Sequence, residues 1–416
     1  MSKRFILKIL IFIVLVTQFY FFDLVPKLNY GIGGINSEAS KKLLFGFLIA
    51  IVVISILPEK TNIIEKNRKY LFTLPVWFLV VADIYVTIMT ARLYDQTIVE
   101  SLANGYNFLL IIGYFGLAYF LTDQQNFEFF YRVIRGFGFF YLVLQILQGI
   151  LYKLTGAIFL QYLGGTLANL SNLGRFTEGT DIVTFASVLV SISPFLFKRK
   201  WEVMDISLMI LGIAYHAIFA QGRMYLVISV GAIVISTMFQ LGNSRYFSIF
   251  KYAFYFVGAL LLVVVVQKMN FFSSGERALS LSMRQLSFEY YWNKIFSNVT
   301  FGIGFPNPIT YKNLLKGTPG IDTAGGYYNP ADVGVVGTAG ILGVSAMVFF
   351  IWVLLIMIKT YSKMKDAQKK ALLIVMFYIG LSLTTLSPLD MQRVFLLVLT
   401  LATADFIYNQ KEEVSV

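Results

Sequence analysis

Long runs of apolar residues, separated by short polar segments, occupy most of the chain. A transmembrane helix needs about 20 consecutive, mainly apolar residues, with a range of roughly 17–25. On that template the pattern predicts an all-α integral membrane protein with about twelve membrane-spanning helices. The predicted spans lie near residues 5–25, 43–58, 71–90, 106–121, 137–154, 181–197, 206–221, 224–240, 253–267, 341–359, 371–387 and 393–409.

Composition agrees with this prediction, because the chain has too few charged residues to cover a water-soluble globule of its size. Apolar residues make up 57% and charged residues 13% of the 416 residues. In a typical soluble domain about 25% of residues are charged. Since no internal repeat or second soluble domain is visible, we expect residues 1–416 to form a single polytopic domain in a lipid bilayer.

The basic residues indicate how the helices are oriented. Short cytoplasmic loops of membrane proteins are enriched in Lys and Arg, and the basic segments 59–69, 198–200 and 363–370 fall on one side of the predicted topology. This side is predicted to be cytoplasmic and to hold both termini, in a multi-pass protein of the cell membrane. The same trend accounts for the net charge of +12, so no nucleic-acid partner is predicted.

One predicted connector, residues 268–340 between the ninth and tenth spans, is longer than a simple loop requires. We expect it to be a large extracytoplasmic loop, because long loops cross the membrane largely regardless of their charge. The loop contains Arg277, Arg284, Trp292 and the Gly/Pro-rich stretch 300–308. It is predicted to be partly helical and to cap the membrane domain.

Four arginines, Arg175, Arg223, Arg277 and Arg284, lie on the outer side of this topology, where the charge trend disfavours them. Arg223 falls where the seventh span turns into the eighth, and a charged side chain within the membrane costs on the order of 2.5 kcal/mol or more. Because a guanidinium donates two parallel hydrogen bonds to a phosphate, converging arginines are predicted to hold a diphosphate. The alternative is that each arginine snorkels to water or forms a structural ion pair.

Other residues lie near these arginines in the sequence. Glu178 and Asp181 follow Arg175 and are expected to orient it, since two carboxylates are too few for a cation site. Arg277 and Arg284 are seven residues apart, so on a helix they lie nearly on one face, about 10 Å from each other.

Asp332 precedes the tenth span, in a segment where glycines recur every three residues at positions 334, 337, 340 and 343. Small residues at this spacing let membrane helices pack closely, and we expect that role for the glycines. Two roles stay open for Asp332. One is a general base that accepts a proton from a hydroxyl nucleophile; the other is an N-cap of the following helix.

His216 is the only histidine, and the chain has no cysteine. We expect His216 to lie on the same helix as Arg223, at mid-span, and to pack or to form a buried hydrogen bond. One His without Cys cannot make a zinc site, and no P-loop or dinucleotide-binding turn is present. The sequence therefore predicts no metal site and no cofactor.

Short segments, taken in their order along the chain, resemble the O-antigen polymerase and ligase superfamily of bacterial envelope polysaccharide enzymes. They cover residues 174–343, and the rest of the chain is similar to that family only in hydropathy. The segments are R-x-x-x-G at 175–179, Gly222-Arg223 where a helix pair turns, Arg284 and Trp292 in the large loop, GIGF at 302–305 and G-x-x-G at 340–343.

The resemblance implies a type C glycosyltransferase-like bundle that acts on undecaprenyl-diphosphate-linked glycans, as donor and as acceptor, without a metal. It implies that Arg175, Arg223 and Arg284 grip the diphosphate, and we add Arg277 to this set. Arg223 and Arg284 would also stabilise the leaving group, with Asp332 as the base.

Glu178, Trp292 and Asn329 are predicted to support this site. At the register where the ligase branch of the family has a His-Asn pair, this chain has Asn329-Pro330. The D-V-G at 332–334 instead is similar to the polymerase branch. The expected activity is polymerisation of capsule, exopolysaccharide or O-antigen repeat units, with a flippase and a chain-length regulator as partners. The alternatives are ligase-type transfer to another acceptor, and a flippase or other transporter.

Overall fold

The computed structural model describes residues 3–19, 38–56, 69–156, 179–240, 276–318 and 327–410. Every regular element in these ranges is a helix, which confirms the all-α prediction for this part of the chain. Seven of the described helices are long and apolar enough to cross a bilayer. They indicate a membrane protein, because helices of this length and composition match the bilayer hydrocarbon.

The helices fall into three groups. Those of spanning length are α3 (Thr73–Leu93), α4 with η2 and α5 (together Ile98–Leu121), α6 (Gln124–Thr155), α7 (Thr180–Phe197), α9 (Arg223–Gln240), α14 (Val344–Tyr361) and α15 (Asp366–Thr385). Other apolar helices are α1 (Lys3–Phe19), α2 (Glu38–Ile56), α8 (Val203–Ala214) with the π-helical turn η3 (Tyr215–Phe219), and α16 (Val394–Asn409). The predicted loop contributes α11 (Glu276–Ser297), α12 (Lys312–Lys316), the 3-10 turn η5 (Pro330–Asp332) and α13 (Gly334–Leu342).

Each predicted span that falls within the described residues coincides with a helix, although the ends differ by several residues. The predicted span 253–267 lies outside the described residues, as does the end of the first span. The count of about twelve spans therefore stays a prediction. The tenth span differs in one respect: the chain breaks at Gly343, whose φ of +68° separates α13 from α14.

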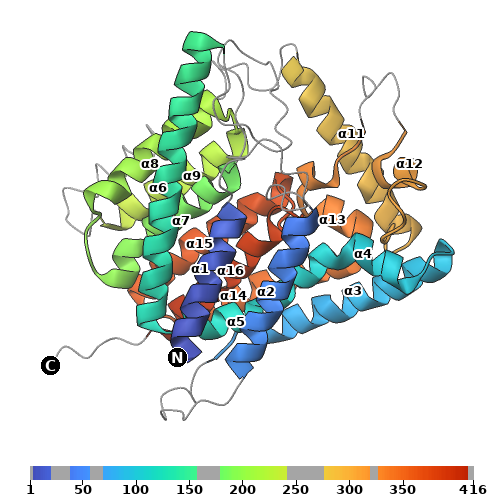
Figure 1. Cartoon of the computed structure of the whole chain (residues 1–416), viewed down its shortest axis with the longest axis horizontal. Coiled ribbons are helices and arrows are strands. Elements are labelled where there is room, and N and C mark those ends of the chain that lie inside the picture. The colour runs from blue at the N-terminus through green and yellow to red at the C-terminus, as the bar shows by residue number, and fades with distance from the viewer. Residues whose placement is uncertain are drawn as a thin grey trace.

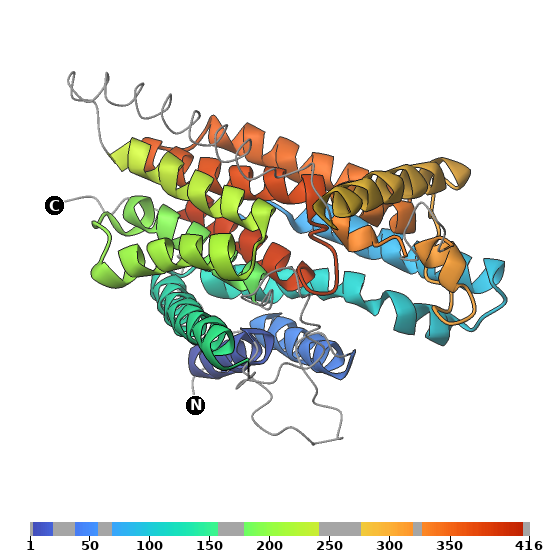
Figure 2. The same cartoon turned by 90° about the horizontal axis from the view of Figure 1, so that it is seen from above.

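The helices pack as a layered bundle. In Figure 2, α14, α15 and α16, coloured orange to red, run roughly side by side with α3 and α4–α5, coloured blue to cyan. In Figure 1, α1 and α2 lie in front of this layer; α1 packs against α6 and α2, and α2 packs against α5. α11 and α12 lie at the upper right of Figure 1, where α11 packs against α13.

The basic segments 198–200 and 363–370 lie at one end of the bundle. Nε2 of Gln410 donates to the carbonyl of Leu196 at 2.5 Å, which ties the end of α16 to the end of α7. Nε2 of Gln368, at the start of α15, donates to the carbonyl of Gln410 at 3.0 Å. The two segments that the sequence assigns to one side of the membrane are thus neighbours in the fold.

The predicted boundary at Gly222-Arg223 is confirmed as a break between helices. The π-helical turn η3 ends α8, Gln221 has a φ of +50°, and α9 begins at Arg223. His216 lies in η3, so the expectation that it shares a helix with Arg223 is wrong. The break arises because the π-helical turn and the positive φ of Gln221 interrupt the regular α-helical hydrogen bonds.

Candidate functional site

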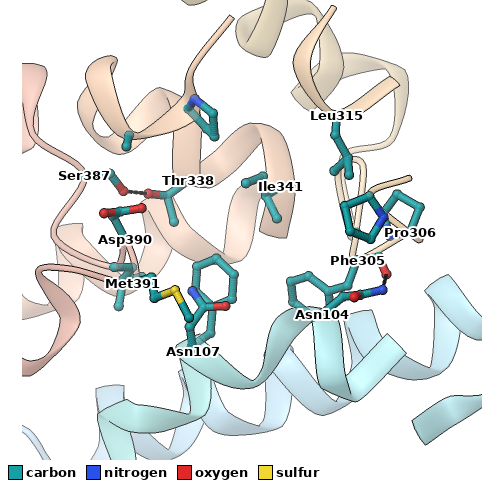
Figure 3. Close-up of a pocket in the computed structure, with 16 residues that line it drawn as sticks. Asn104, Asn107, Phe305, Pro306, Leu315, Thr338, Ile341, Ser387, Asp390 and Met391 are labelled. Carbon is teal, nitrogen blue, oxygen red and sulfur yellow. Dashed lines mark hydrogen bonds between the residues drawn. The ribbon is translucent and has the colours of Figure 1, made fainter. Parts of the chain in front are cut away.

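A cavity of about 260 Å³ opens where α4, the 304–308 segment, α13 and the α15–α16 connection meet (Figure 3). This connection joins the end of α15 to the start of α16, so the cavity lies at the opposite end of both helices from the basic segments. The lining residues used below are Asn104, Asn107, Phe108, Phe305, Thr338, Ser387, Asp390 and Met391.

One wall of the cavity is built by two glycine-containing segments that the sequence singled out, 302–305 and 340–343. The Ile303 N–H donates to the carbonyl of Gly340 at 2.8 Å, and the Gly304 N–H donates to that of Ile341 at 2.9 Å. Gly302 has a φ of +59°, and a Cβ there would lie 2.4 Å from the Gly340 carbonyl oxygen. Glycine is needed because no side chain fits between the two backbones.

α4 forms the opposite wall. A capping box between Thr97 and Glu100 fixes the start of this helix. Asn104 and Asn107, three residues apart and therefore on one face, turn their amides toward the cavity (Figure 3). The rings of Phe108 and Phe305 stack with their centroids 5.5 Å apart, which places an aromatic surface between the two walls.

The third wall carries hydroxyl groups and a carboxylate. Thr338 and Ser387 share a hydrogen bond between their side chains, and Asp390 lies beside them (Figure 3). Burial raises the pKa of Asp390 above its ordinary value, although the positive charge of Arg393 opposes the rise. A carboxyl group with a raised pKa, facing a cavity, is a common feature of functional sites.

Arg393, directly behind Asp390, is the hub of a buried polar cluster. Its Nε donates to Asp181 Oδ1 at 3.0 Å, its Nη2 to the Tyr225 hydroxyl at 3.1 Å and its Nη1 to the Ala331 carbonyl at 3.3 Å. Asp390 Oδ2 lies 3.9 Å from Nη1. The carboxylates of Asp181 and Asp390 therefore both lie close to the charge of Arg393.

This cluster joins the starts of α7, α9 and α16 to η5. Arg393, its central residue, was not among the site residues predicted from the sequence. All three guanidinium nitrogens of Arg393 have protein partners, so its charge is already compensated. The sequence does carry a signal for Arg393, because this arginine begins the last predicted span on the outer side, just as Arg223 lies at the start of the eighth. Asp181 pairs with Arg393, which differs from the expectation that it orients Arg175.

The predicted diphosphate arginines are only partly visible. Arg175 and its neighbour Glu178 lie outside the described residues, and the side chain of Arg277 does too. Arg223 begins α9, two residues before Tyr225, and is half-buried. Because Arg393 donates both to the Tyr225 hydroxyl and to the Ala331 carbonyl, it holds the start of α9 near η5. Arg284 lies on α11 with an exposed side chain.

Asp332, the predicted base, lies in η5, next to the cavity-lining Ala331. Nδ2 of Asn329 donates to Asp332 Oδ2 at 3.1 Å, so the predicted supporting residue does contact the predicted base. The alternative N-cap role of Asp332 is wrong. Asn329 caps η5 through its side chain, and α13 begins after Val333 without a side-chain cap.

Two further predicted residues have clear packing roles. Trp292 on α11 stacks on Phe288 with ring centroids 5.8 Å apart and contacts Phe296 edge-on. His216 is buried, and its Nε2 lies 3.1 Å from the Thr184 hydroxyl, which confirms the expected buried hydrogen bond.

The described residues contain no group of three or more His, Asp or Glu side chains that could hold a metal ion. The cavity instead offers amides, hydroxyls, one carboxylate and an aromatic surface, a set that suits a ligand rich in hydroxyl groups. No protein-family model matches the chain, and no curated protein matches it either. The resemblance to polysaccharide polymerases and ligases therefore stays a prediction.

Proposed function

We propose that this protein is a membrane glycosyltransferase that polymerises glycan repeat units carried on undecaprenyl diphosphate. The observation that carries the proposal is the cavity itself. Its walls unite two glycine segments from the family resemblance, and its lining presents amides and hydroxyls with one carboxylate. Arg223 begins the helix that the Arg393 cluster holds near this cavity.

Orientation follows from the arrangement of the two ends. The basic segments 198–200 and 363–370 gather at the end of the bundle opposite the cavity. Because basic loops favour the cytoplasm, the cavity and Arg223 would face the outer surface. Lipid-linked repeat units that have crossed the membrane would meet the site there.

In the proposed reaction, a sugar hydroxyl of the incoming unit attacks the anomeric carbon of the growing chain. The new C–O bond forms as the bond to the lipid diphosphate breaks, and the diphosphate leaves with the electron pair. The hydroxyl proton passes to the carboxylate of Asp332 as general base. The guanidinium groups of Arg175, Arg223, Arg277 and Arg284 would stabilise the departing anion, and a preorganised donor of this kind lowers a barrier by roughly 3–4 kcal/mol.

The test is an assay of the purified full chain with lipid-linked repeat units. A polymerase yields a ladder of progressively longer lipid-linked glycans. Asp332→Asn should abolish the ladder if Asp332 is the base, whereas Asn329→Ala should only slow it and shift its pH profile. Transfer of glycan solely to a foreign acceptor would replace the proposal by the ligase function.

One observation favours transport as a second candidate function. Asp83 lies in the middle of α3, is 1% exposed, and neither of its carboxylate oxygens has a partner among the described residues. Carboxyl groups inside a membrane often mark an ion or proton path. If unmodified lipid-linked substrate crosses the membrane of reconstituted vesicles, and Asp83→Asn stops this movement, the protein is a transporter.

A further inference from the structure

The charge of the described residues around the cavity is the opposite of what a diphosphate site needs. Among the described residues that line it, Asp390 is the only charged one. Arg393 lies 3.9 Å from Asp390, but its three nitrogens already contact Asp181, Tyr225 and the Ala331 carbonyl. Among the described residues, the carboxylates of Asp181 and Asp390 therefore face the single guanidinium of Arg393, and their summed charge is negative.

A diphosphate would be repelled from such a cavity, because like charges close together in a partly desolvated site cost free energy. A sugar hydroxyl, in contrast, both donates and accepts hydrogen bonds. It can donate to the Asp390 carboxylate and accept from the Asn107 amide on the facing wall, whereas Nδ2 of Asn104 already donates to the Phe305 carbonyl at 3.4 Å. The stacked rings of Phe108 and Phe305 supply the apolar surface on which a sugar face can lie.

We propose that this cavity binds the terminal sugar of the acceptor glycan, and that it selects a sugar without an anionic group. The donor's diphosphate binds outside it, on the side of Arg223. The assignment of the sugar as an acceptor rests on the proposed function, whereas the selection against anions rests on the cavity alone.

The absence of cysteine from the chain makes a direct test of the charge preference simple. Met391 lines the cavity next to Asp390 (Figure 3), so Met391→Cys places a single thiol there. Cationic, neutral and anionic methanethiosulfonate reagents then report the local potential through their reaction rates. Ser297→Cys, on the exposed face of α11, gives the reference rate of each reagent. Relative to these reference rates, we expect the cationic reagent to react with Met391→Cys about ten-fold faster than the anionic one.

Adding Asp390→Asn to Met391→Cys should remove most of the rate difference between the cationic and anionic reagents, because Asn keeps the shape of Asp390 without its charge. Equal rates for the two charged reagents in the single variant would overturn the selection against anions. So would a preference that persists unchanged in the double variant.

The acceptor assignment is tested by blocking the cavity. Met391→Cys protein labelled with the neutral reagent should lose chain elongation at least about ten-fold relative to the same protein unlabelled. Gln392→Cys, at the neighbouring exposed residue outside the cavity lining, is the matched control and should elongate equally with and without label. Normal elongation by the labelled Met391→Cys protein would refute the acceptor subsite but leave the polymerase standing. Failure of the unmodified chain to elongate at all would refute the proposed function, and the reagent rates would still measure the charge preference.

Discussion

Nε of Arg393 donates to the carboxylate of Asp181 at 3.0 Å, and this ion pair joins the start of α16 to the start of α7. The two residues are 212 positions apart in the chain. Their side chains are only 13% and 18% exposed, so the charge of Asp181 depends on Arg393 for compensation. The pair therefore fixes the end of the bundle at which the cavity lies.

Breaking this pair should be costly. Arg393→Met leaves Asp181 buried without its cation, and we expect a loss of about 3–5 kcal/mol in the free energy of unfolding. Because the double variant Arg393→Met with Asp181→Leu removes both charges, it should recover part of that loss. Denaturant titration in detergent measures the free energy of unfolding of the single and the double variant. As a control, the exposed pair Arg132–Glu128 should contribute less than about 1 kcal/mol. Equal effects for the two pairs would contradict the central role of Arg393.

Arg223→Lys should lower the elongation rate at least about a hundred-fold while expression stays normal, because an ammonium cannot donate the two parallel hydrogen bonds of a guanidinium. The ladder assay measures this change beside a stability measurement of the same sample. Arg132→Lys, at an exposed position on α6, is the control and should retain activity. Full activity of the Arg223 variant would remove that residue from the diphosphate site.

Gly302→Ala should destabilise the cavity wall. The added Cβ would lie 2.4 Å from the Gly340 carbonyl oxygen, and the φ of +59° strains any L side chain. We expect a cost of about 1–3 kcal/mol, or more if the backbone cannot shift. Gly380→Ala in α15 is the matched control, because no atom lies within 4 Å of its added Cβ. Thermal unfolding should give a lower midpoint for Gly302→Ala than for Gly380→Ala. Similar midpoints for the two variants would show that the 302–305 and 340–343 segments do not pack as described.

The stability contributed by Asp390 should depend on pH. Burial, opposed by Arg393, raises its pKa in the folded state above the ordinary value of 3.8. A raised carboxyl pKa means that the favourable contribution is complete below the ordinary value and is lost as pH rises through the folded pKa. Asp390→Asn stays neutral, so its stability relative to the natural chain should increase with pH across that window. Unfolding midpoints measured at several pH values check this, and parallel curves for the two proteins would contradict it.

The sequence alone determined the helical class, because runs of apolar residues at bilayer length leave few other structures possible. It also located the break at Gly222-Arg223 and the two glycine segments that meet in the cavity wall. Glycine and helix-breaking signals are local, so they can be recognised without knowledge of the partners.

Only the tertiary structure showed which polar groups share one site. Asp390 and Arg393 lie in a short connector of ordinary appearance, and their importance comes from Asp181, Tyr225 and the cavity. That Asp332 does not cap α13 was likewise beyond the sequence, since an N-cap and a carboxylate bonded to a neighbouring side chain have the same local pattern. Pairings between distant helices depend on how the whole bundle packs, because the burial of a charge and the identity of its partner are properties of the fold and not of any single segment.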